Sequence, residues 1–431
     1  MEGRDKQRLA AFAAAWLRIG LLGFGGPAGQ IALMHRVVVE EQRWLDDKRY
    51  LAALNFCMLL PGPEAQQLAT YCGWVRHGVL GGLIAGGLFV LPGALVMLAL
   101  ATLYVLHGDM PLVAALFYGI KAAVLAVVIE ALLRVARRAL THRLHWLLAG
   151  LAFLALFLFA LPFPLVIVVA GLIGWATTPA PTATTGDLEP TPAAGGRHTL
   201  VTTLLCGVIW AMPVLLAARL LGPDHVLTEI GLFFSRMAVV TFGGAYAVLA
   251  YVAQAAVNEH HWLTAAEMLD GLGLAETTPG PLVLVLQFVG FLAAWREAAP
   301  FTPWLAGLLG AVMTLWATFA PSFLWIFAAA PHLERLRRMP RLQGALAGIT
   351  AAVVGVILNL GLWFALHLLF GDVGTWRVGP LQVAAPTLST FDPKAAVLAA
   401  LAGLALLRWR VGLLPTLAGG AMAGLALHLL A

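Results

Sequence analysis

The chain has 431 residues, of which 61% are hydrophobic and only 11% are Asp, Glu, Lys or Arg. Soluble domains have about 25% charged residues, so this composition excludes a disordered protein, a nucleic-acid-binding module and a conventional soluble enzyme. The 45 Gly and 24 Pro are typical of membrane helices, which tolerate both residues. We therefore predict an all-α polytopic membrane protein with the lipid bilayer, and no nucleic acid, as its partner.

Apolar segments recur along the whole chain. A helix that crosses a bilayer needs roughly 20 apolar residues, and about thirteen segments reach or approach that length. They fall at 9–34, 50–75, 79–106, 111–133, 146–160, 162–177, 200–221, 227–254, 264–294, 303–330, 342–369, 394–408 and 411–430. The stretch 179–199 is rich in Pro, Thr, Ala and Gly and is typical of a linker. It separates a first transmembrane repeat, 1–178, from a second, 200–431, in which 200–221 is an extra span.

Basic residues in short loops orient the spans, because such loops stay on the cytoplasmic side. Arginine clusters lie within 134–143 and 332–341, and Arg4, Lys6 and Arg8 precede the first span. Thirteen spans, with the N-terminus in the cytoplasm, place all three groups on the cytoplasmic side. We expect a multi-pass protein of the cell (inner) membrane, with a cytoplasmic N-terminus and the C-terminus outside. The net charge of +5 is then explained by the Lys and Arg residues of cytoplasmic loops, which orient the protein in the membrane.

The sequence contains an internal repeat. Residues 24–63 align with 242–281 at an offset of 218, and thirteen of these forty positions are identical. Seven of the identities are Phe, Gly, Trp or Pro, whereas chance matches in this chain would favour Ala and Leu. The shared motifs are FGG (24–26 and 242–244), Trp-Leu (44–45 and 262–263) and PGP (61–63 and 279–281). We infer a duplication.

The two copies carry opposite charge in equivalent loops. After its third span the first copy has 107–111 without Lys or Arg, whereas the second copy has the arginine-rich 332–341. After the fourth span the pattern reverses, since 370–393 contains only Arg377. The positive-inside rule then requires copies of opposite topology, as in many secondary transporters.

The FGG and PGP motifs interrupt segments that are otherwise continuous and apolar. Pro removes a backbone donor and Gly permits positive φ, so each motif is expected to break a helix. Pro is favoured at helix starts, and the free N–H groups of a helix start bind anions. Four such starts, two from each copy, are predicted to converge near the bilayer midplane. The alternative is that these motifs serve only packing or kinking.

Charged residues inside the apolar segments are further candidates, because a buried cation is costly unless it is paired. Arg18 and Arg236 each stand six residues before an FGG motif, and Lys121 lies inside the fourth span. Snorkelling to the interface is the alternative for Arg18. Glu64, Glu130 and Glu276 are possible partners or proton carriers.

The residues also predict no enzyme chemistry. Cys57, Cys72 and Cys206 lack metal-ligand spacing, and the histidines lack the pairing that a metal or haem needs. We therefore expect no cofactor, no metal and no catalytic residue.

With these motifs the sequence resembles the chromate ion transporter family in its long, two-domain form. The resemblance lies in FGGP (24–27), LPGPEAQQLATYCG (60–73), GIKAAV from Gly119, FGGAYAVL from Phe242 and TTPGPLVL from Thr277. The family implies efflux of chromate, a tetrahedral dianion, with resistance as the result. Sulfate has a similar charge and shape and remains the alternative substrate. Ala245 stands where the first copy has Pro27, which puts the second FGG in doubt as an anion site.

The helix breaks and the resemblance together give a fold and a substrate site. The fold is two inverted repeats with helices broken at FGG and PGP, acting by alternating access and driven by an ion gradient or the membrane potential. The alternatives are a sulfate transporter of the same architecture and a membrane-bound chromate reductase, and a homodimer is one of the assemblies allowed. The candidate substrate-binding residues are Arg18, Phe24, Gly25, Gly26, Pro27, Pro61, Gly62, Pro63, Glu64, Gln66, Lys121, Arg236, Gly243, Gly244, Thr278, Pro279, Gly280 and Pro281.

Overall fold

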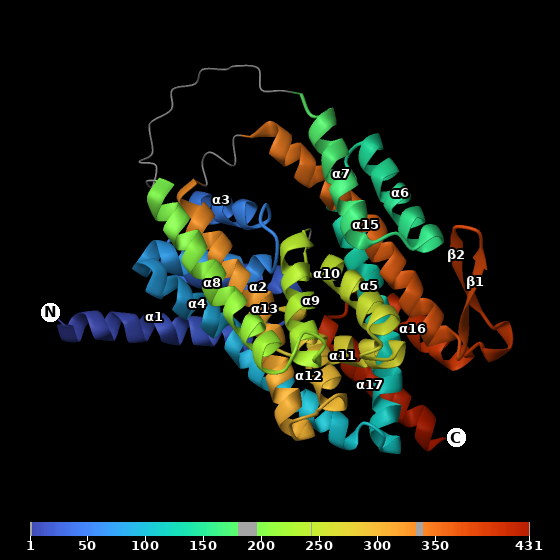
Figure 1. Cartoon of the computed structure of the whole chain (residues 1–431). Coiled ribbons are helices and arrows are strands. Elements are labelled where there is room, and N and C mark those ends of the chain that lie inside the picture. Colours follow the sequence, from blue (N-terminus) through green and yellow to red (C-terminus); the bar gives the residue numbers. More distant parts are fainter. Residues whose placement is uncertain (1, 180–195, 243, 333–338, 431) are drawn as a thin grey trace. The chain divides into compact units, whose positions relative to one another are not determined.

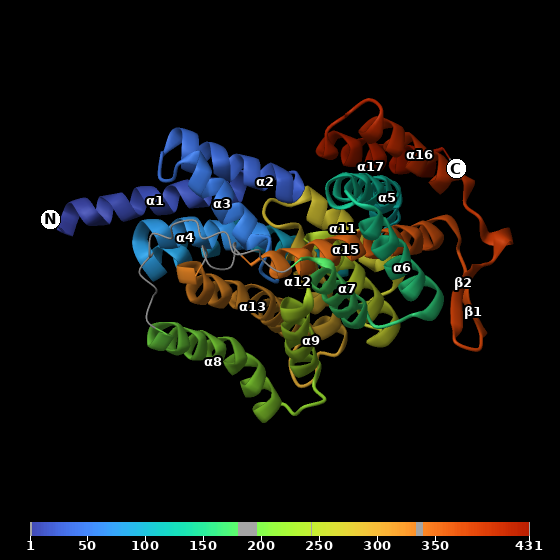
Figure 2. The same cartoon turned by 90° about the horizontal axis from the view of Figure 1, so that it is seen from above.

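The computed structural model describes residues 2–179, 196–242, 244–332 and 339–430 (Figures 1 and 2). Gly243, most of the predicted linker and the arginines at 335, 337 and 338 lie outside the described residues. The chain forms two compact units, and each contains segments of both sequence copies. The first unit comprises Met1–Leu100, Ala180–Ala245 and Thr278–Pro340, and the second comprises Ala101–Pro179, Tyr246–Thr277 and Arg341–Ala431. The predicted division into two sequence repeats, 1–178 and 200–431, differs from this structural division and stays a prediction.

The regular elements in the described residues of the first unit are all helices. Its elements are α1 (Glu2–Leu22), α2 (Gly26–His35), the π-helix η1 (Arg36–Glu41), α3 (Asp47–Cys57), most of α4 (Glu64–His107), α8 (Gly196–Leu220), α9 (Val226–Val240), η3 (Leu282–Leu284), α12 (Val285–Arg296), α13 (Pro303–Ala329) and η4 (Ala330–His332). Helix α13 packs against α8, α9 and α12 (Figure 1). The start of α3 is capped by Asp46, whose carboxylate accepts from the amide of Arg49 at 2.8 Å.

Helix α4 reverses direction within the first unit. His77 and Gly78 leave helical geometry, with φ of +60° at Gly78, and the arms before and after them pack side by side. A Cβ added at Gly73 or Gly81 would collide with the backbone of the opposite arm, so these glycines permit the close approach. The arm 64–76 is about 20 Å long at 1.5 Å per residue, which is too short to cross a bilayer alone. Helices α12 and α13 form the matching pair in the second copy.

The second unit is built around α5. Its helical elements are α5 (Pro111–Ala139), α6 (Arg143–Phe159), α7 (Phe163–Thr177), α10 (Ala245–Gln254), the π-helix η2 (Ala255–Glu259), α11 (Ala265–Thr277), α15 (Pro340–Leu369), η5 (Leu388–Thr390), α16 (Pro393–Leu407) and α17 (Leu413–Leu429). Helices α16 and α17 pack on α5 (Figures 1 and 2). Gly119 of α5 meets Gly420 and Gly424 of α17 so closely that a Cβ at Gly119 would strike the Gly420 carbonyl.

A β-hairpin interrupts the second unit where the sequence predicted a loop. Strands β1 (Val373–Val378) and β2 (Leu381–Pro386) pair antiparallel, with Val378 opposite Leu381. The connection is Gly379-Pro380, and Gly379 has φ of +59°, which Gly adopts without strain. Strand β2 contacts α6 (Figure 1). The all-α prediction is therefore right for the membrane-type helices and wrong for this segment.

The two sequence copies have matching element order. Helices α2 and α10 are each followed by a short π-helix, η1 or η2, and then by α3 or α11. Because π-helices are rare, their recurrence at equivalent positions supports the duplication. The pair α6–α7 likewise corresponds to α16–α17. The second copy alone contains the hairpin.

Five helical segments in the described part of the chain are long and apolar enough to cross a membrane. They are Glu64–His107, Pro111–Ala139, Thr199–Leu220, Pro303–His332 and Pro340–Leu369. Shorter apolar helices of 10–17 residues are Leu9–Leu22, Arg143–Phe159, Phe163–Thr177, Leu282–Arg296, Pro393–Leu407 and Leu413–Leu429. The chain is thus a helical membrane protein, and the predicted count of spans stays a prediction.

Candidate functional site at the broken helices

All four motifs break helices, as the sequence predicted. FGG separates α1 from α2 and α9 from α10, and PGP separates α3 from α4 and α11 from η3. The conformations explain why glycine is needed: φ is +86° at Gly25, +103° at Gly62, +93° at Gly244 and +92° at Gly280. L-residues with side chains rarely adopt these angles.

Two backbone hydrogen bonds join the motifs crosswise inside the first unit. The amide of Gly280 donates to the carbonyl of Gly23 at 2.9 Å, and the amide of Gly62 donates to the carbonyl of Thr241 at 3.0 Å. Gly23 and Thr241 each precede an FGG motif, and they are equivalent at the offset of 218, as are Gly62 and Gly280. Each PGP of one copy is therefore bonded to the FGG break of the other copy.

Gln30 strengthens one of these crossings. Its side chain is fully buried, and its Nε2 donates to the carbonyl of Gly23 at 3.3 Å and to the carbonyl of Gly280. Its Oε1 has no hydrogen-bond partner. Gln30 is not among the predicted site residues, and its contact with residue 280 could not be seen from the sequence.

The first PGP has polar neighbours. Gln67 Nε2 donates to the Pro61 carbonyl at 2.6 Å, and a Cβ at Gly62 would lie 3.3 Å from both Gln67 Nε2 and Ser322 Oγ. The buried oxygens Gln66 Oε1, Gln67 Oε1 and Ser322 Oγ have no hydrogen-bond partner. Buried polar groups are normally satisfied by protein or water, so this cluster of unpaired oxygens indicates a place for water or a polar ligand.

The start of α4 adds backbone donors to this polar region. The first intrahelical bond of the helix runs from the Gln67 amide to the Pro63 carbonyl at 3.0 Å. Ala65 and Gln66 therefore lie in the first turn, where amides have no intrahelical acceptor and the helix dipole is positive. Pro61, Gly62 and Glu64 are partly exposed, so this break is open to small molecules.

The second PGP is buried, and the carbonyl of its glycine accepts from the buried amide of Gln30. Thr278, Pro279, Gly280 and Pro281 are all buried, and a Cβ at Gly280 would lie 3.2 Å from Leu284 Cδ1. Gly93 packs against it so closely that a Cβ there would collide with the Pro279 carbonyl. This break is therefore closely packed against its neighbours.

Around the FGG motifs the surroundings are more open. A Cβ at Gly25 or Gly26 would meet nothing within 4 Å, and Phe24 is 36% exposed. Pro27 lies in the first turn of α2, as predicted for a helix start. Glu64 Oε1 lies 3.9 Å from the position that a Cβ of Gly244 would occupy. A carboxylate at this point would compete with an oxyanion for nearby amides.

The two arginines before the FGG motifs are exposed. Arg18 Nη1 donates to Glu41 Oε2 at 3.1 Å, and its side chain is 57% exposed. Exposed ion pairs of this kind contribute little. The role of Arg18 and Arg236 as charge compensators stays a prediction, and their exposure favours the snorkelling alternative.

Lys121 lies in the second unit and has a partner that the sequence analysis missed. Its Nζ lies 3.4 Å from Asp270 Oδ1, and Tyr104 donates its hydroxyl to Asp270 Oδ2 at 2.9 Å. The signal was present, since Asp270 is one of three acids, with Glu267 and Glu276, within the apolar segment 264–294. Glu276, also on α11, accepts from the hydroxyl of Tyr246 at 2.9 Å, and Glu130 pairs with Arg134 at 2.5 Å.

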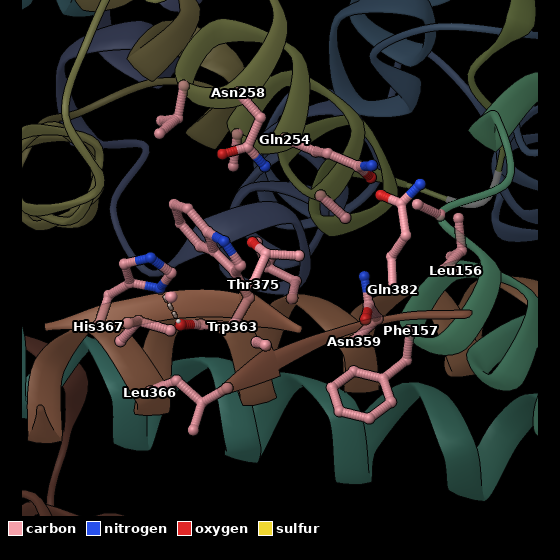
Figure 3. Close-up of a pocket in the computed structure, with 18 of the residues that line it drawn as sticks. Leu156, Phe157, Gln254, Asn258, Asn359, Trp363, Leu366, His367, Thr375 and Gln382 are labelled. Atoms are coloured by element: carbon pink, nitrogen blue, oxygen red, sulfur yellow. Dashed lines mark hydrogen bonds between the residues drawn. The ribbon is translucent and has the colours of Figure 1, made fainter. Parts of the chain in front are cut away.

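The second unit also contains a cavity of about 570 Å³. It lies between α6, α10, η2, α15 and the hairpin, and none of the predicted site residues lines it. Figure 3 shows the polar side chains that line it together with Trp363, while His367 donates Nδ1–H to the Trp363 carbonyl at 2.9 Å. The labelled polar side chains are Gln254, Asn258, Asn359, His367, Thr375 and Gln382. Pattern reading missed this cavity because it depends on the hairpin.

Comparison with known proteins gives one consistent family. The model described as "Chromate transporter" matches residues 10–175 and 228–425, so both sequence copies are covered. A chromate transport protein of Cupriavidus metallidurans is 30% identical over 349 residues, which are 79% of this chain and 79% of that protein. One of Pseudomonas aeruginosa is 33% identical over 352 residues, 80% of this chain and 78% of that protein. No solved structure matches the chain.

A more distant relative is an uncharacterized transporter of Methanocaldococcus jannaschii. It is 25% identical over 370 residues, which are 85% of this chain and 87% of that protein.

Proposed function

The chain belongs to the chromate transporter family, and from this premise we propose that it is a secondary transporter that exports chromate across the cell membrane. The relatives are named as transport proteins, which fits a protein that moves its substrate without converting it. Export would confer chromate resistance. Two inverted repeats would alternate between inward-open and outward-open states.

The crossed hydrogen bonds between the motifs carry this proposal. Broken helices at membrane depth are tolerated only where the backbone is buried in protein or lines a wet cavity. Here the breaks of the two copies are held together in pairs by the Gly280–Gly23 and Gly62–Thr241 bonds. Equivalent bonds in both directions are what a two-fold relation between the copies would produce.

We place the anion mainly at the first PGP. Its half-helix start offers the first-turn amides of α4, and the buried hydroxyl of Ser322 nearby has no protein partner. A tetrahedral dianion accepts hydrogen bonds, so the amide nitrogens and the Ser322 hydroxyl would donate to it. The other three helix starts, at 24–27, 243–244 and 279–281, would line the rest of the substrate pathway. They would also act as the hinge between the inward-open and outward-open states.

The energy source follows from the charge of the substrate. Chromate leaving the cell moves negative charge outward, and the membrane potential is worth about 2.3 kcal/mol per elementary charge per 100 mV. With no nucleotide-binding motif in the sequence, the potential or an ion gradient would drive the cycle. The cytoplasmic N-terminus and outside C-terminus belong to the same proposal.

The test is uptake of labelled chromate into everted membrane vesicles. We expect energised vesicles that contain the protein to accumulate chromate, and we expect a protonophore combined with a potassium ionophore to abolish accumulation. Accumulation that resists both treatments would contradict a secondary transporter. A flavin, haem or iron–sulfur absorbance in the purified protein would instead favour the reductase.

Sulfate serves as the competing substrate in the same assay. If excess sulfate fails to inhibit, the site selects chromate. If labelled sulfate accumulates better than chromate, and intact cells accumulate it as well, the protein is a sulfate importer of the same architecture.

A further inference from the structure

An ion pair is buried in the second unit, where Lys121 of α5 meets Asp270 of α11. We propose that Asp270 is the proton-binding group that couples transport to the pH gradient, with Lys121 and Tyr104 holding its charged form. This inference rests on the transport function proposed above. It assigns a ligand, the proton, to a site that contains none of the FGG and PGP residues.

The geometry isolates Asp270 from solvent. Its side chain is 7% exposed, while that of Lys121 is 20% exposed. Each carboxylate oxygen has one neighbour: Oδ1 lies 3.4 Å from Lys121 Nζ, and Oδ2 accepts from the Tyr104 hydroxyl at 2.9 Å. The Tyr104 ring is itself held edge-on against Phe117 of α5, with 5.4 Å between centroids.

A buried ion pair reduces the stability of the folded protein, so its presence calls for a functional explanation. Two charges removed from water lose hydration, and a well-packed apolar pair would often be as stable or more stable. Ionisable residues inside membrane segments therefore mark ion pathways by default. Oδ1 has no conventional hydrogen bond, so the carboxylate is held by charge on one side and by a hydroxyl on the other. It can accept a proton without a large rearrangement.

The repeat shows that the fold does not need this pair. Asp270 is equivalent to Ala52 at the offset of 218, and Lys121 is equivalent to Thr350 at the offset of 229. Lys121 belongs to the first copy and Asp270 to the second, so the pair joins the two copies. The equivalent helices, α3 and α15, form with small neutral residues at these positions. An ion pair that is absent at the equivalent positions of a duplicated fold is better explained by the transport cycle than by packing.

The other titratable groups around Asp270 already have partners or lie at a distance along their helices. Helix α11 packs against α5 and α17. On α11 itself, Glu267 binds Thr264 at 2.8 Å and Glu276 binds Tyr246. The remaining groups are Tyr118, bound to Asp392, and Glu130, bound to Arg134, with Arg137 and Arg138 in the last turn of α5 and His428 in the last turn of α17.

Protonation would change the second unit through charge. When Asp270 takes up a proton from one side of the membrane, its negative charge is removed and Lys121 is left as an unpaired cation among apolar groups. That state is unfavourable in the conformation described here, so a protonated carrier would favour a conformation in which α5 and α11 are repositioned. Release of the proton on the other side would restore the pair. The proton is bound and released as such, and no other group is consumed.

The experiment compares two assays on the purified protein in proteoliposomes. Counterflow exchanges labelled for unlabelled chromate without a gradient, and accumulation is driven by a pH gradient imposed in each direction in turn. We expect the wild type to show both, with one gradient direction driving accumulation. We expect Asp270→Asn to keep counterflow within about threefold while its accumulation falls to the level seen without a gradient.

A double variant guards against a folding defect. Asp270→Asn alone leaves Lys121 unpaired, whereas Asp270→Asn with Lys121→Gln removes both charges. If the pair were only structural, the double variant would regain counterflow and pH-driven accumulation together. If Asp270 binds the proton, the double variant exchanges chromate but does not respond to pH. Glu130→Gln, which breaks the more exposed ion pair on the same helix, is the matched control and should leave coupling unchanged.

The outcomes separate the two proposals. A pH-driven accumulation by Asp270→Asn or by the double variant that equals the wild type would overturn the role of Asp270. So would a wild type that exchanges chromate but responds to neither gradient direction. A wild type that shows no counterflow with chromate or sulfate would contradict the proposed transport function instead.

Discussion

The two PGP breaks have the same three residues but different surroundings. The first is partly exposed and faces Gln67 and Ser322, whereas the second is fully buried against Leu284 and Gly93. The equivalent positions explain the difference: Gln66 corresponds to Leu284, and Ser322 corresponds to Gly93. Gly93, in the first copy, lets the backbones touch at the second break, whereas Ser322, in the second copy, places a hydroxyl at the first break. We therefore propose that the first break serves the substrate and that the second holds the helices together.

Gly62→Leu should have the largest effect on transport. The residue has φ of +103°, and even a Cβ would lie 3.3 Å from Gln67 Nε2 and Ser322 Oγ, so a leucine would fill the polar space. We expect chromate transport per inserted molecule to fall by about 100-fold or more, equivalent to roughly 2.7 kcal/mol. Vesicle uptake normalised to immunoblotted protein measures this. Transport within threefold of wild type would remove the first PGP from the proposed site.

Gln66→Leu gives the first break the residue that stands at the equivalent position of the second break, Leu284. The substitution removes a buried side-chain amide whose second N–H would donate to the anion, and a lost hydrogen bond to a charged ligand costs about 1.5–3 kcal/mol. We expect KM for chromate to rise about tenfold or more, with normal protein levels. Gln287→Ala is the matched control, because Gln287 donates to the Ala94 carbonyl at 3.0 Å in the second copy and Ala69 is its equivalent. An equal rise in KM for both variants would contradict the distinction between the breaks.

Gly280→Ala should affect stability more than transport. The added Cβ would press on Leu284 Cδ1 at 3.2 Å, and φ of +92° is strained for alanine. We expect the free energy of unfolding to fall by about 1–3 kcal/mol, seen as a lower Tm of the detergent-solubilised protein, with KM unchanged within about twofold. A rise in KM as large as that of Gln66→Leu would give the two breaks the same role.

Arg18→Gln should have the smallest effect. Its guanidinium is bound to Glu41 and largely exposed, and such pairs contribute about 0–1 kcal/mol. We expect transport and stability to change less than about threefold, measured by the same vesicle assay. A tenfold loss of transport with intact expression would instead support the compensation of substrate charge that the sequence predicts for this residue.

The helix breaks could be predicted from the sequence because their cause is local. Gly25, Gly62 and Gly280 have positive φ, and a proline within two residues of each removes a backbone donor, so the interruption depends on few neighbours. The Lys121–Asp270 pair could not be assigned in the same way. Its two members are far apart in the chain, and only the packing of α5 against α11 makes them neighbours.

The hairpin and the crossed bonds required the structure for other reasons. Residues 373–386 alternate weakly and are exposed, so their strand pattern was overlooked among longer apolar segments. The bond from Gly62 to Thr241 joins backbone atoms, which carry no sequence signal at all. The duplication indicated that equivalent contacts would exist, but only coordinates show that they run between the copies.

The interleaved units have a consequence for biosynthesis. The first unit draws on Met1–Leu100 but also on Thr278–Pro340. During translation the earliest helices must therefore wait in the translocon or the lipid until residues near 340 have left the ribosome. A chain cleaved in the linker should yield two fragments that are each degraded when made alone and that recover activity when synthesised together in one cell.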